Sequence, residues 1–228
     1  MHHIISVLET KTFLKEINIM KKILATLLAI SSVAAFADTF QDFNNNLYAQ
    51  YGLTGYNSNT IKDVQTNGFG IGGTFQSANN IWVNTNFVQN NTTEGINAGN
   101  TFGLKAGYAF QFFGDDDNGF QVIPYASFGY ANGATNALDQ NNQAYTGGGY
   151  DAYSWGIGVQ PEYRFLSSLK ASLGLGVAGA NGFNVNPEVQ YDIAKTVMVA
   201  VGYNYTSQFN SSNTLNTNSL NVKVGYLF

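Results

Sequence analysis

The sequence predicts an all-β protein: ten antiparallel strands closed into an up-and-down barrel that spans a membrane. Three observations predict it. Apolar and polar residues alternate at period two along most of the chain, which is typical of strands with two different faces. The links between these runs are short and long in alternation. Charged residues make up only 11% of the 228 residues, against roughly 25% in ordinary soluble domains.

The first five runs of alternation each place apolar or aromatic residues on one face and Gly, Asn, Thr, Ser or Gln on the other. In the first run, for example, Leu47, Tyr51 and Leu53 oppose Gln50 and Thr54. These runs cover residues 47–54, 68–75, 81–87, 102–112 and 120–130.

The last five runs keep the same alternation, with Val, Leu, Ile and Tyr on the apolar face. They cover residues 153–165, 169–177, 185–193, 197–205 and 220–228. Pro124, Pro161 and Pro187 fall on the apolar face, and each removes one ladder hydrogen bond, so we expect the register to be most vulnerable there. Without runs 169–177 and 185–193 the barrel would have eight strands, which is the alternative architecture.

The links between runs support closure into a barrel. Compact links at 77–80, 113–119, 166–168 and 194–196 alternate with longer ones at 57–67, 90–99, 131–149 and 207–219; the link at 178–184 departs from the pattern. Short turns at one end and long loops at the other are typical of outer-membrane barrels. Aromatic residues near both ends of the strands, with aliphatic residues between them, indicate two interfacial girdles.

A soluble β-sandwich also alternates at period two. It would present a charged face to water, whereas the polar face here is Gly, Asn, Thr and Ser. The barrel is therefore the favoured architecture, because closure also removes exposed strand edges.

The amino-terminal residues predict export. Residues 20–37 resemble a bacterial secretory signal, with Lys21 and Lys22 before an apolar run and Ala35-Phe36-Ala37 as a small-x-small cleavage site. We expect cleavage between Ala37 and Asp38, and we expect residues 1–19 to be an upstream leader that is not native to the protein. The barrel would then comprise residues 38–228.

Removal of these segments changes the charge and the available chemistry. Residues 38–228 contain six basic and twelve acidic residues, a net charge of −6, which disfavours nucleic acid as a partner. Both histidines, His2 and His3, lie in the leader, and the chain has no cysteine. A disulfide framework is therefore excluded.

The carboxyl-terminal residues 219–228 read Ser-Leu-Asn-Val-Lys-Val-Gly-Tyr-Leu-Phe. With Val222, Val224, Tyr226 and the terminal Phe228, they resemble the targeting strand of bacterial outer-membrane proteins. The whole of 38–228 resembles the small barrel domains of OmpA-like, opacity-like and porin-family proteins in length and pattern. The resemblance implies location in the outer membrane of a Gram-negative bacterium, contact with its lipid, and recognition by the barrel-assembly machinery.

Catalysis is not expected. Barrel enzymes such as omptin proteases and outer-membrane phospholipase, as the resemblance to those families implies, use a catalytic histidine, and imidazole is the side chain best suited to act as a base at neutral pH. A carboxylate-only enzyme is the least favoured function. The acidic run at 115–117 resembles half a calcium loop, but the twelfth position is Tyr125 rather than Glu. We therefore expect no metal and no cofactor.

The predicted inward face carries seven charged residues. By parity they are Lys105, Glu162, Arg164, Lys170, Glu188, Asp192 and Lys223. One interpretation is that they pair and plug a narrow barrel, since buried charges must be paired; the other is that they line a small polar pore. Ten strands enclose little more than side chains, which favours the plug, although Gly68, Gly70, Gly72, Gly174 and Gly176 leave part of the wall bare.

These features predict a passive surface or structural protein, or a narrow porin-like pore for small solutes. The alternative is an adhesin that binds host or matrix ligands through its long loops, above all 131–149.

Overall fold

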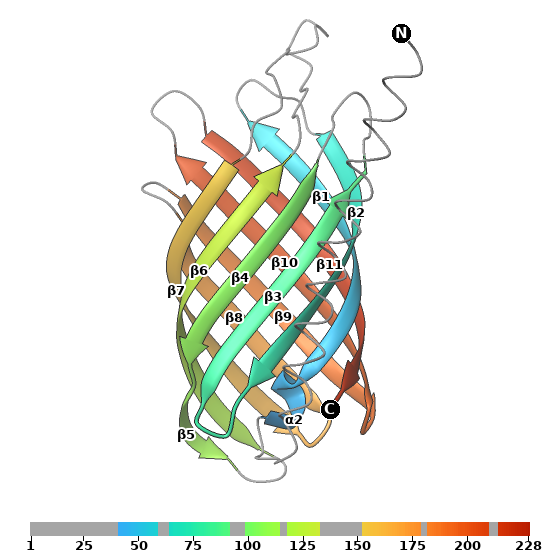
Figure 1. Ribbon diagram of the computed structural model, residues 1–228, viewed down its shortest axis with the longest axis vertical. Helices are drawn as coiled ribbons and strands as arrows, with labels where there is room; N and C mark the ends of the chain where they lie inside the picture. Colours follow the sequence, from blue (N-terminus) through green and yellow to red (C-terminus); the bar gives the residue numbers. More distant parts are fainter. Residues whose placement is uncertain are drawn as a thin grey trace, which may run out of the picture. The chain divides into compact units, whose positions relative to one another are not determined.

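The computed structural model describes residues 41–58, 64–91, 99–114, 118–132, 152–178, 182–209 and 214–228. They belong to one compact unit, 37–228. A short helix, α2 (Gln41–Asn44), precedes a single antiparallel sheet (Figure 1). Its strands are β1 (Asn46–Ser58), β2 (Val64–Gln76), β3 (Ile81–Asn90), β4 (Asn100–Tyr108), β5 (Phe110–Gly114), β6 (Gly119–Asn132), β7 (Ala152–Leu166), β8 (Leu169–Ala178), β9 (Gly182–Ala194), β10 (Val197–Phe209) and β11 (Thr214–Leu227).

The sheet closes on itself. Strands that are neighbours in sequence pair with each other, except β4 and β5, which both pair with β6; β1 pairs with β11 (Figure 1). Since β4 and β5 occupy one place in the ring, the barrel has ten strands, which confirms the prediction. The eight-strand alternative is wrong, because β8 and β9 both pair on two sides.

The three prolines interrupt pairing without changing register. Pro124 lies opposite Tyr108, where the pairing of β6 stops on β4 and resumes on β5 in the same register. The same gap occurs opposite Pro161 in β8 and opposite Pro187 in β10. A proline has no N–H to donate to the ladder, so the division between β4 and β5 follows from Pro124.

The two faces of the strands differ as predicted. Outward residues are exposed, among them Trp155 at 68% and Phe69 at 61%, whereas Gln50, Glu162 and Lys170 on the inward face are buried. This inversion, with apolar residues outside and polar residues inside, is what a barrel in lipid requires. No helix among the described residues is long and apolar enough to cross a membrane.

Two of the predicted long loops are wrong in extent. The link predicted at 57–67 is strand up to Ser58 and again from Val64, and the link at 207–219 is strand up to Phe209 and again from Thr214. The side chains there include Thr217 and Ser219, whose polarity suggested loop. Backbone pairing continues regardless, because residues beyond the lipid need not be apolar.

Several predictions concern residues outside the described ranges. The leader 1–19, the signal 20–37 and the cleavage site at Ala35, Ala37 and Asp38 are among them, as are the acidic run 115–117 and loop residues 133–149.

Candidate functional site in the barrel lumen

The described strands contain seven charged residues, and they are the seven predicted for the lumen. Lys105 is on β4, Glu162 and Arg164 are on β7, and Lys170 is on β8; the others are Glu188 and Asp192 on β9 and Lys223 on β11. Five of them line one internal cavity: Lys105, Glu162, Lys170, Glu188 and Lys223. Arg164 is 3% exposed and also lies inside.

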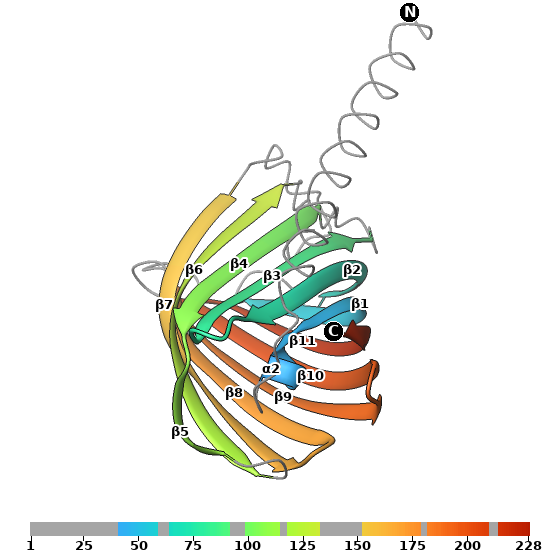
Figure 2. The same ribbon diagram turned by 60° about the horizontal axis from the view of Figure 1, so that its bottom comes forward.

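The helix α2 lies inside the ring of strands at the end where the short turns are (Figure 2). We call this the turn end and the opposite one the loop end. The Phe43 side chain is 1% exposed. Its ring lies 5.8 Å from the Arg164 guanidinium carbon and 6.0 Å from Lys170 Nζ, distances at which a cation is attracted to an aromatic face. The Phe43 carbonyl accepts hydrogen bonds from Asn46 Nδ2 at 2.8 Å and Gln190 Nε2 at 3.3 Å.

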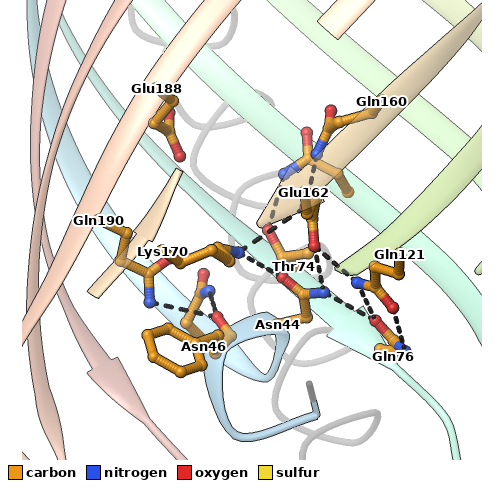
Figure 3. Close-up of polar contacts among 12 residues, drawn as sticks. Asn44, Asn46, Thr74, Gln76, Gln121, Gln160, Glu162, Lys170, Glu188 and Gln190 are labelled. Atoms are coloured by element: carbon orange, nitrogen blue, oxygen red, sulfur yellow. Dashed lines mark hydrogen bonds and ion pairs between the residues drawn. The ribbon is translucent and has the colours of Figure 1, made fainter. Parts of the chain in front are cut away.

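Asn44 connects α2 to the wall (Figure 3). Its amide nitrogen donates to Glu162 Oε2 at 2.9 Å and to Gln76 Oε1 at 2.7 Å, and its oxygen accepts from Lys170 Nζ at 2.5 Å. Gln121 Nε2 also donates to Glu162 Oε2, at 2.6 Å. We call Phe43, Asn44, Gln76, Gln121, Glu162 and Lys170 the turn-end plug.

The turn-end plug contains an ion pair whose two side chains are almost fully buried. Lys170 Nζ is 3.8 Å from Glu162 Oε1, and the two side chains are 6% and 1% exposed. Gln160 Nε2 donates to the same oxygen at 2.8 Å. Because both carboxylate oxygens have amide donors, the desolvated charge of Glu162 is compensated by several groups, as a buried ion pair requires.

A second ion pair lies farther from α2, on the loop side of the plug. Lys223 Nζ is 2.5 Å from Glu188 Oε2, and these side chains are 15% and 25% exposed. Figure 3 shows Glu188 farther from α2 than Lys170 is. Lys105 Nζ lies 4.9 Å from the centroid of the Tyr125 ring. No carboxylate of the described residues forms an ion pair with Lys105.

A cavity of about 510 Å³ occupies the lumen, with Asn44, Glu162 and Lys170 at its turn end. It extends to residues such as Thr54 and Thr217 near the loop end of the strands. The lining is mostly amide, hydroxyl and glycine. Within the described part of the chain, no group of three or more His, Cys, Asp or Glu residues could hold a metal ion.

Tyrosine side chains cover Gly72 and Gly176 of the predicted bare wall, and they also cover Gly158, which was not among the predicted glycines. A methyl carbon at Gly72 would lie 2.5 Å from Tyr48 Oη, and one at Gly158 would lie 2.5 Å from Tyr125 Oη. At Gly176 the distance to Tyr125 Oη would be 3.0 Å. The glycines therefore make room for inward aromatic side chains, an arrangement that also shields glycine backbone in sheets.

Sequence reasoning missed the residues of α2 and the inward aromatic residues. Phe43 and Asn44 precede the first alternating run and carry no pattern of their own. Trp82 and Tyr125 lie on the inward parity of their runs, so the sequence did contain a signal for them. They form a buried cluster with Ala109 and Ile123.

The closed ten-strand barrel, its apolar exterior and its polar lumen define an integral outer-membrane protein. The chain belongs to the family described as outer membrane protein beta-barrel domain, whose model matches residues 23–228. It is thus located in the outer membrane of a Gram-negative bacterium, in contact with lipid.

Solved structures show similar folds at low sequence identity. The transport unit of the autotransporter AIDA-I from Escherichia coli is 10% identical, with a TM-score of 0.50, and the match covers 90% of this chain and 97% of that one. Neisserial surface protein A is 12% identical with a TM-score of 0.44, over 81% and 97%. Ail, the attachment invasion locus protein of Yersinia pestis, is 12% identical with a TM-score of 0.36, over 81% and 99%. No curated protein matches the chain.

Proposed function

We propose that this protein is a passive outer-membrane barrel that its own α2 closes at the turn end, so that it presents a surface without forming an open diffusion pore. The observation that supports this is the position of Asn44, which bonds to Glu162, Gln76 and Lys170 and has no exposed surface.

The cross-section at the plug supports closure. Phe43, Gln121 and Glu162 are each no more than 1% exposed, and Gln76 is 2% exposed. Side chains buried to this degree have almost no surface in contact with solvent, whereas ion passage through a pore depends on a polar, water-filled path. Barrels of about this strand number have interiors that side chains can fill.

Planar-bilayer recording tests this function. The refolded chain should give no discrete conductance steps, and a variant lacking residues 41–45 should give small steps, because the side chains that fill the turn end are gone. Lys195→Met, which changes an exposed turn residue, should stay silent. Heat-dependent gel mobility checks that each barrel is folded.

Conductance steps from the unaltered chain would contradict closure and favour the narrow pore. A folded, silent variant without 41–45 would also contradict it, because closure would then not depend on α2.

We also propose that the lumen carboxylates have no catalytic role. Glu162 and Glu188 lie 3.8 Å and 2.5 Å from lysine nitrogens, and Asp192 accepts a hydrogen bond from Gln190 Nε2 at 3.0 Å. Carboxylates that are held as charged partners in this way are poor general bases.

For assembly we propose recognition of the carboxyl-terminal strand by the barrel-assembly machinery, after signal cleavage at Ala37. Val222, Val224 and Tyr226 are exposed on the outer face of β11, and the Phe228 amide donates to the Asn45 carbonyl at 3.0 Å. Deletion of Phe228 should lower the amount of folded protein in the outer membrane severalfold. Normal surface levels would contradict the assignment.

A further inference from the structure

We propose that the lumen cavity on the loop side of the plug is a binding site for a small polyhydroxylated carboxylate, such as a sugar acid, with Lys105 as the group that binds the carboxylate. This site is additional to the passive role proposed above, and it rests on that proposal only in that the plug closes the turn end of the lumen.

The charge of the cavity supports an anion. Lys223 is balanced by Glu188, and Lys170 by Glu162. Lys105 is in contact with the Tyr125 ring and with no carboxylate of the described residues. A cation–π contact is weaker than a charged hydrogen bond. A carboxylate within reach would thus be the better partner for Lys105.

Among the described residues that line the cavity, Lys105 is the one cation without an ion-pair partner, which indicates a monoanion. Phosphate groups carry more charge and are usually bound by several cations or a bidentate arginine. The remaining lining groups are neutral: Gln50, Asn86, Ser127 and Asn221 are among them. Amides and hydroxyls both donate and accept hydrogen bonds, so they suit the hydroxyl groups of a sugar acid.

Two buried polar atoms at the cavity strengthen the argument. Trp82 and Tyr125 line the cavity and are 1% and 5% exposed. Trp82 Nε1 and Tyr125 Oη have no hydrogen-bond partner among the described residues. Such atoms normally have a partner, and a hydroxylated ligand can supply one. The plug provides a contrast, since its buried amide groups bond to one another.

The volume of the cavity suits a small-molecule ligand. A cavity of about 510 Å³ falls within the range of small-molecule sites, roughly 300–1,000 Å³.

Tryptophan fluorescence provides the test. The chain has two tryptophans, and Trp155 is on the lipid face, so the Trp155→Phe protein reports on Trp82 alone. D-glucuronate titrated into this protein should change its fluorescence saturably at concentrations up to about 10 mM. D-glucose, which lacks the carboxylate, should bind at least tenfold more weakly.

Matched lysine variants locate the anion contact. Lys105→Met should weaken glucuronate binding by about tenfold to a hundredfold, the usual effect of losing a charged hydrogen bond. Lys105→Arg should retain binding, and Lys195→Met, at an exposed turn lysine, should leave it unchanged. Heat-dependent gel mobility confirms that each variant is folded.

Three outcomes would overturn the proposal: no saturable change with glucuronate, equal affinity for glucose, or unchanged affinity in Lys105→Met. None of these outcomes would contradict the proposed closure by the plug, because conductance tests that closure separately.

Discussion

Two inward glutamates, one in the turn-end plug and one on the loop side of it, have different surroundings. Glu162 and Glu188 are both inward glutamates with a lysine partner. Glu162 is 1% exposed and accepts from three amide groups, those of Asn44, Gln121 and Gln160. Glu188 is 25% exposed and faces the cavity with Lys223 as its ion-pair partner.

The difference shows what separates a structural charge from an available one. At the turn end the amide donors come from α2, β6 and β7, so the carboxylate is fixed from several sides. On the loop side of the plug the lumen contains the cavity, and Lys105 lacks a carboxylate partner among the described residues. Strand alternation predicts that both glutamates point into the lumen. Whether such a side chain becomes part of the plug or remains accessible in the cavity depends on the residues around it.

The largest expected effect is on stability at the plug. Glu162→Ala leaves Lys170 buried without its ion-pair partner and removes the acceptor of Asn44, so unfolding should become easier by about 3–5 kcal/mol. Glu188→Ala should cost roughly 1 kcal/mol, because Lys223 can be hydrated in the cavity. Urea titration of each refolded protein in lipid vesicles measures both. Equal losses would mean that the two ends do not differ.

A smaller effect is expected where rings meet glycine. Gly72→Ala and Gly158→Ala each force a methyl group against a tyrosine hydroxyl and a backbone carbonyl oxygen, and overpacking of this kind costs about 1–3 kcal/mol. Gly55→Ala is the control, since a methyl carbon there would lie 3.7 Å from its nearest neighbour, Asn218 Nδ2. The urea midpoint should fall for the first two and stay constant for the third. A comparable fall for Gly55→Ala would show that loss of glycine, and not the crowding of the added methyl group, is responsible.

The smallest effect is expected at Pro124. Pro124→Ala restores an N–H opposite Tyr108, so β4 and β5 should join into one continuous strand, and the new amide should be protected from hydrogen exchange. Stability should change by less than about 1 kcal/mol, because the added hydrogen bond is offset by the greater freedom of the unfolded chain. Rapid exchange of this newly introduced backbone amide would show that the break has another cause.

The fold could be predicted from the sequence almost entirely, because strand faces follow from local alternation. The closed barrel, its ten strands and the inward charges can all be predicted from the alternation of apolar and polar residues, because one face of each strand contacts lipid and the other faces the lumen. The plug could not be predicted in the same way. Asn44 meets Glu162 and Lys170 across 118 and 126 residues of sequence, and such contacts depend on the stagger of all the strands between them.

The contacts of the inward aromatic residues also could not be predicted from the sequence. Parity places Tyr48 and Tyr125 inside, but only the register shows that Tyr48 pairs with Gly72 and Tyr125 with Gly158. The bare glycine wall suggested by the sequence was therefore partly wrong, since neighbouring strands supply the rings that cover it.

Water exchange of side-chain amide protons, measured by solution NMR on the refolded protein in micelles, tests the difference between the two ends most directly. The NH₂ groups of Asn44 and Gln121 should exchange slowly, because both donate within the plug. Those of Asn86 and Asn221, which line the cavity, should exchange rapidly with water. Rapid exchange at Asn44 and Gln121 would show that the turn end is open to water and would contradict the account.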